Sequence, residues 1–131
     1  MKMTTERARL HNRRFNETVD LHFEGQHYHA TIGYFADGQP GEVFCHGAKV
    51  GSGMDLLIDD ACVALSMLLQ HGAEPIALAH SMGRLGDGAP ASIVGALAIL
   101  MADTAEAAEK GTADETSDDH VQPPNGDRPD G

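Results

Sequence analysis

The fold of this chain is decided by residues 37–72, DGQPGEVFCHGAKVGSGMDLLIDDACVALSMLLQHG. The stretch begins with a turn at Asp37-Gly38 and a short strand over residues 42–46. After Gly51 the hydrophobic period changes from two residues to about 3.6, which is the period of an α-helix. Ser52, with an aspartate three residues later, approximates a capping box, and the glycine at position 72 is a typical helix C′ residue. We therefore expect a strand, a glycine-rich turn and one long apolar helix in direct succession.

Two more strands are expected before this stretch. Residues 18–23 alternate, with Val19, Leu21 and Phe23 on one face, and residues 26–34 alternate in the same way. Glu24-Gly25 can close a two-residue hairpin turn between them. The economical arrangement is a three-stranded antiparallel meander packed by two to three helices, which makes the fold class α+β.

The chain after the long helix divides into helices and loops. Pro75 starts a short second helix, a loop with three glycines and a proline follows at 83–91, and a third helix extends from Ser92 toward Lys110. Residues 111–131 contain Val121 as their single large aliphatic side chain, amid acids, prolines and glycines. We expect a basic flexible arm at 1–17, one α+β domain at 18–110, and a disordered acidic tail at 111–131.

Composition limits the classes of function. A chain of 131 residues with 41% hydrophobic content builds one modest core. No apolar run is long enough to span a membrane and no secretory signal is present, which predicts a cytoplasmic protein without membrane contact. The net charge is −11. An acidic body repels phosphate backbones, so we expect no direct nucleic-acid binding through the folded domain, although the basic arm alone could contact an anion.

The two cysteines carry no recognisable chemistry. Cys45 and Cys62 fall in a predicted strand and a predicted helix, without the CxxC spacing of zinc or redox sites. We interpret them as small core hydrophobes.

The long helix is apolar over more than half of its circumference. Its main stripe is accompanied by a second, narrower line of Leu56, Val63 and Met67. Such a helix needs cover on two sides, from the sheet and from a second helix or another chain. Homodimerisation through this helix is therefore an expectation.

A family resemblance rests on three short strings. The order Glu42-Val43-Phe44-Cys45, then Lys49-x-Gly51-Ser52, then the Gln70-His71-Gly72 helix end resembles the TSCPD domain. The resemblance covers residues 14–103, and PASIVGALAILMAD at 90–103 looks like the closing helix of the free-standing members.

The resemblance implies a small α+β module, found at the C-terminal end of adenosylcobalamin-dependent ribonucleotide reductases and as short separate proteins. The Thr-Ser-Cys-Pro-Asp string of the family and a C-terminal cysteine cluster are absent here. No thiol function can therefore be transferred to this chain, and its size excludes the reductase activity itself.

The first candidate site is the turn before the long helix. Lys49, Gly51, Ser52 and Gly53 combine flexible backbone, a cation and a helix N-terminus, which favours a phosphate or carboxylate ligand. The lysine precedes the glycines, so the turn is not a Walker A loop. The alternative is a simple structural turn, in which Asp55 occupies the free amides itself.

The second candidate follows from the hairpin register. With Glu24-Gly25 as the turn, His22 opposes His27 and Asp20 opposes His29, which gathers enough donors for a zinc or nickel site. The alternative is a polar sheet face exposed to solvent, and a slip of one residue would scatter the set. From the sequence alone we assign no metal and no cofactor.

Three functions remain open. The first is a non-catalytic protein-binding or regulatory module with a TSCPD-like fold, acting near ribonucleotide reduction. The second is an acidic nucleic-acid mimic that occupies the basic groove of a defence or DNA-binding protein. The third is a small-ligand or nucleotide binder that uses the Lys49 turn. No nucleophile context or carboxylate pocket indicates an enzyme.

Overall fold

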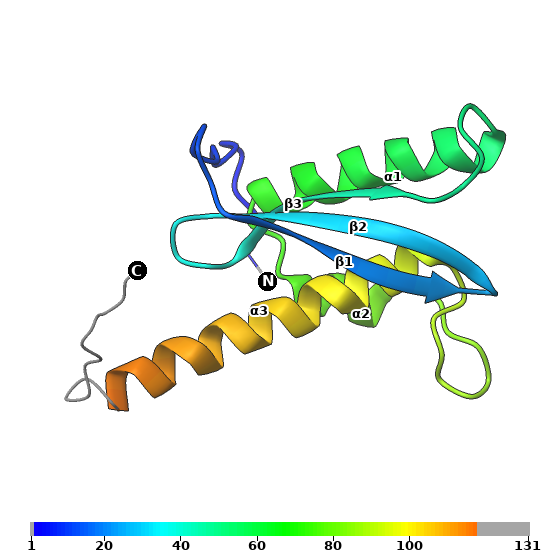
Figure 1. Ribbon diagram of the computed structural model, residues 1–131. Coiled ribbons are helices and arrows are strands. Elements are labelled where there is room, and N and C mark those ends of the chain that lie inside the picture. Colours follow the sequence, from blue (N-terminus) through cyan, green and yellow to red (C-terminus); the bar gives the residue numbers. More distant parts are fainter. Residues whose placement is uncertain (1, 118–131) are drawn as a thin grey trace, which may run out of the picture.

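The sheet is the predicted meander. The computed structural model of the protein describes residues 2–117, and the side chains of residues 2–111. Strands β1 (Asn16–Phe23), β2 (Gln26–Tyr34) and β3 (Pro40–His46) form an antiparallel sheet in the order β1-β2-β3 (Figure 1). Glu24 and Gly25 have φ values of 51° and 76°, as a two-residue type I′ turn requires. The predicted hairpin is therefore confirmed.

Helices cover one face of this sheet and one of its edges. They are α1 (Gly53–Gln70), α2 (Pro75–Ser81) and α3 (Ile93–Ser117), and the predicted α+β class is confirmed. Figure 1 shows α1 beside β3, and α3 with α2 on the other side of the strands in that view. Alternate residues of β2 and β3 join the helices in one core, whose largest fully buried side chains are Ile32, Val43, Cys45, Ile58, Leu97 and Met101.

Helix α1 closes the open edge of β3 with polar side chains. Val43 N donates to Ser66 Oγ at 2.9 Å, and Gln70 Nε2 donates to Gly41 O at 2.8 Å. Four residues of helix advance about 6 Å and two residues of strand advance about 6.6 Å. Helix positions four apart therefore stay level with strand positions two apart, so Ser66 and Gln70 both reach β3.

Residues 2–15 run against the end of α1 without forming a helix or strand. Thr4 N donates to His71 O at 2.8 Å, Ala8 N donates to Gln70 O at 2.7 Å, and Arg14 Nε lies 2.6 Å from Glu42 Oε2. These bonds place the predicted arm over the C-terminal end of α1. Its flexibility stays a prediction.

The last helix is longer than the sequence suggests. We expected its end near Lys110, and α3 continues to Ser117. Residues 118–131 of the predicted tail lie outside the described residues. Among the residues the structure describes, no helix is long and apolar enough to cross a membrane.

Candidate functional site

The outer face of the sheet carries a group that we call the histidine face: Asp20, His22, His27, His29 and His46. The β1–β2 register pairs Asp20 with His29 and His22 with His27, as the sequence predicted. In antiparallel strands such opposed side chains lie on the same face. All five are exposed.

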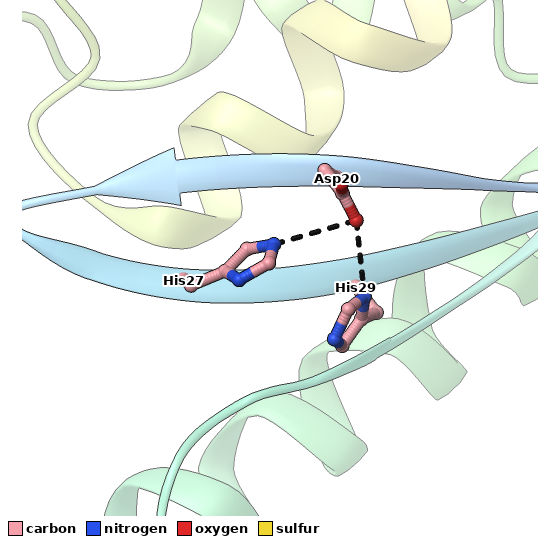
Figure 2. Close-up of side chains that lie close together, drawn as sticks. All are labelled: Asp20, His27 and His29. Carbon is pink, nitrogen blue, oxygen red and sulfur yellow. Dashed lines mark hydrogen bonds and ion pairs between the residues drawn. The ribbon is translucent and has the colours of Figure 1, made fainter.

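Three of these side chains converge on one atom. His27 Nε2 lies 3.3 Å and His29 Nδ1 lies 3.2 Å from the same carboxylate oxygen, Asp20 Oδ1 (Figure 2). The ring of His22 stacks on that of His27 with centroids 4.5 Å apart, and the rings of His27 and His29 are 4.7 Å apart. A carboxylate on β1 is thus held between two imidazoles on β2.

The imidazoles change the acidity of the carboxyl. The hydrogen bond from His27 is the main cause that lowers the pKa of Asp20 below its ordinary value, and the charges of His27 and His29 act in the same direction. Desolvation, the second-largest cause, acts in the opposite direction. The carboxylate is therefore ionised at neutral pH and available as a ligand.

His46 is a member that sequence reasoning missed. In β3 its neighbour Cys45 is buried on the inner face, whereas His46 is exposed on the outer face. In the β2–β3 register His46 opposes His29. Its ring nitrogen also lies within 4.8 Å of carboxylate oxygens of Asp55 and Asp59. Finding His46 required the register between β2 and β3. Because a bulge at Gly33/Tyr34 shifts this register, it cannot be obtained by counting residues from the turn.

The predicted anion-binding turn is partly occupied by the chain itself. Gly51 N donates to Asp55 Oδ2 at 2.9 Å, and Asp55 N donates to Ser52 Oγ at 3.2 Å. Lys49 and Gly53 are exposed on either side. Because an aspartate takes an amide that an anion would use, the geometry suits a structural turn. Ligand binding by Lys49, Gly51, Ser52 and Gly53 stays a prediction.

A pocket that the sequence did not indicate lies where the arm meets α1 and β3. It has a volume of about 410 Å³ and includes Arg7, Arg14, Glu42 and Gln70. Arg14 is paired with Glu42, and Arg7 Nε donates to Gln70 Oε1. These arginines are engaged by the protein, which leaves them poorly placed to attract an anion.

The outward half of α1 carries apolar side chains that are exposed, except for Ala61, which is half-buried. Leu57 is 63% exposed and Val63 is 58% exposed, where a helix of a monomer usually presents polar residues. Asp60 lies between the exposed apolar lines of this surface. We call the following set the α1 face: Met54, Leu56, Leu57, Ala61, Val63, Ala64, Met67 and Leu68.

Comparison with known proteins gives no relative for this chain. No family model matches it, and neither a curated protein nor a solved structure is similar enough to count as a match. The TSCPD resemblance stays a prediction.

Proposed function

We propose that this protein is a non-catalytic protein-binding module, that the α1 face is its binding surface, and that a second copy of the chain is the first partner. The exposure of large apolar side chains along one helix carries the proposal. Single apolar residues are common on protein surfaces, whereas a contiguous patch marks an interaction site.

The spacing within the α1 face favours pairing with another helix. Met54, Leu57, Ala61, Ala64 and Leu68 follow one another at steps of three, four, three and four residues. This is the a/d spacing of a coiled-coil seam. The two alanines at the middle of the seam allow close approach of the backbones, and the leucines on either side supply apolar area.

The same spacing is self-complementary when two helices run antiparallel. With a two-fold axis between Cys62 and Val63, Leu57 packs against the partner's Leu68 and Ala61 packs against the partner's Ala64. A two-fold interface must match a surface with itself, and this seam does so without a change of register. The second copy is therefore the occupant that fits the pattern best.

The size of the helix limits the strength of this contact. Eighteen residues span about 27 Å, and a strip about 10 Å wide covers roughly 300 Å² on each copy. Stable interfaces bury about 800 Å² on each partner. We expect a reversible dimer with a dissociation constant of roughly micromolar or weaker, which leaves the surface available for exchange with another partner.

Sedimentation velocity tests this proposal over a range of protein concentrations starting at about 1 μM. The wild-type chain should change from monomer to dimer as the concentration rises. Ala64→Glu introduces a charge at the centre of the seam and should abolish the dimer. The matched control, Leu85→Glu, changes an exposed residue in the loop at 83–91 and should leave it intact. A wild-type chain that stays monomeric at the highest concentration, or equal behaviour of both variants, would refute the proposal.

Salt dependence separates this function from the acidic-mimic alternative. Apolar association changes little with ionic strength, whereas capture of a basic partner weakens steeply as salt screens the charges. We therefore expect the dimer to persist at high salt.

The TSCPD resemblance supplies the metabolic setting of the proposal. If the module acts near ribonucleotide reduction, a reductase subunit should bind the wild-type chain and Leu85→Glu and should lose affinity for Ala64→Glu. Absence of reductase binding removes that setting and leaves the dimer proposal standing.

A further inference from the structure

We propose that Asp20, His27 and His29 form a binding site for one zinc ion on the outer face of the sheet. This inference is independent of the α1 face, because it rests on other residues of another surface.

The distances between donor atoms match the shape of a zinc site. Zinc binds imidazole nitrogen and carboxylate oxygen at about 2.0–2.2 Å, and its ligands form a tetrahedron with edges of about 3.3 Å. The two edges that meet at Asp20 Oδ1 measure 3.3 Å to His27 Nε2 and 3.2 Å to His29 Nδ1. Two of the three edges therefore already have the required length, although these contacts are hydrogen bonds without the ion. When zinc binds, each imidazole carries its proton on the other ring nitrogen and turns the free lone pair toward the ion.

The third edge needs only a rotation of side chains. All three donor atoms lie within 4.8 Å of one another. Each of these side chains is about half exposed or more, so an imidazole can turn toward the ion without displacing the core. Figure 2 shows both rings on the same side of the strands as the carboxylate, with α3 passing behind them.

The backbone holds the ligands in place before any ion arrives. His27 and His29 are two residues apart on β2 and so share a face, and Asp20 is paired with His29 across the β1–β2 ladder. The buried inner face fixes that register, because a slip by one residue would expose Tyr28 and Ala30. A site on paired strands loses less entropy on binding than one assembled from a loop.

The donor set and the charge of the protein indicate which ion binds. Two imidazoles and one carboxylate are ligands of zinc and of similar borderline divalent ions, and three protein ligands leave a fourth position for water. The ring of His22 stacks on that of His27, 4.5 Å away between centroids, and so lies beside the three ligands. A net charge of −11 raises the local concentration of divalent cations.

Isothermal titration of the full, tag-free chain with zinc chloride tests the proposal. Wild-type protein should bind one zinc per chain, and cobalt in its place should give the visible absorption of tetrahedral coordination. His27→Ala/His29→Ala should weaken zinc binding at least about 100-fold, since even the loss of groups that only orient ligands weakens metal binding 10–100-fold. Circular dichroism of this variant without metal should match that of the wild-type chain, because both side chains are about half exposed.

Two control variants distinguish this site from ordinary surface histidines. His80→Ala on α2 removes an exposed imidazole far from the three ligands in sequence and should leave zinc affinity unchanged. His46→Ala tests the neighbouring group with Asp55 and Asp59, and should also leave the one-zinc stoichiometry intact. No zinc binding by the wild-type chain, or unchanged binding by His27→Ala/His29→Ala, would overturn the proposal, as would equal weakening by His80→Ala.

Discussion

Ser66 is the residue that shows best how this fold treats an open strand edge. Its hydroxyl accepts from Val43 N at 2.9 Å and donates to Val43 O at 3.3 Å, so one side chain replaces two bonds of a missing fourth strand. Unpaired strand edges are templates for aggregation, and covering them with a helix is one of the ways proteins avoid it. A serine in the apolar stripe of α1 therefore has a structural reason.

Ser66→Ala should lower the free energy of unfolding by about 1–3 kcal/mol, because the buried Val43 N–H loses its acceptor. Ser81→Ala is the control, since the Ser81 hydroxyl is exposed and donates to Ala77 O within its own helix. That change should stay within about 0.5 kcal/mol. Urea unfolding followed by circular dichroism measures both, and equal effects would contradict the role given to Ser66.

Among the elements, the β1–β2 hairpin was the most predictable from the sequence. Alternation fixed its faces and Glu24-Gly25 fixed its register, so the positions of Asp20, His22, His27 and His29 followed directly. The register of the second hairpin was harder to predict, because a bulge at Gly33/Tyr34 shifts the pairing and the sequence carries no clear sign of that bulge. This is why His46 was missed on a face whose other members were found.

Contacts between distant elements could not be predicted in the same way. The period of the hydrophobic residues indicates which face of a strand or helix is buried. It does not indicate which polar atoms form hydrogen bonds with each other. Two examples are the hydrogen bonds between Ser66 and Val43 and those between the arm and the end of α1. Both depend on how the elements pack in three dimensions. The apolar line of α1 was visible in the sequence, whereas its exposure became known only from the structure.

The hairpin turn itself gives a prediction at the scale of this element. Glu24 has a φ of 51°, a left-handed conformation that asparagine tolerates better than glutamate, and Asn-Gly is a favoured type I′ pair. Glu24→Asn should therefore raise the free energy of unfolding by about 0.5 kcal/mol or more. Glu6→Asn, which removes the same charge from the exposed arm, should have little effect. Thermal unfolding of both variants decides the matter, and destabilisation by Glu24→Asn would contradict the assigned turn.

At the scale of the whole molecule, one core encloses ionisable groups that stay neutral. Cys45 is 1% exposed and Cys62 is 4% exposed, between β3 and α1. Burial raises the pKa of Cys45 to about 11 and is the main cause that raises the pKa of Cys62 to about 12. Burial, followed by the hydrogen bond to Glu17, raises the pKa of Tyr34 to about 12. The stability of the folded chain should therefore fall at alkaline pH, where Cys45, Cys62 and Tyr34 can lose their protons.

The free energy of unfolding should fall as the pH rises above 9.0, the ordinary pKa of a thiol. In the unfolded chain Cys45 and Cys62 lose their protons near that pH, whereas in the folded chain they keep them to about 11 and about 12. The stabilisation is thus complete below pH 9.0 and is lost through the window up to the folded values, with a slope of at most about 1.4 kcal/mol per pH unit for each thiol. Urea unfolding about one pH unit below and above 9.0 measures that slope. Cys45→Ala/Cys62→Ala should make the slope shallower whatever the stability of the variant, because it removes both thiols and leaves Tyr34, which titrates at higher pH. An equally steep slope in that variant would show that the loss arises elsewhere in the molecule.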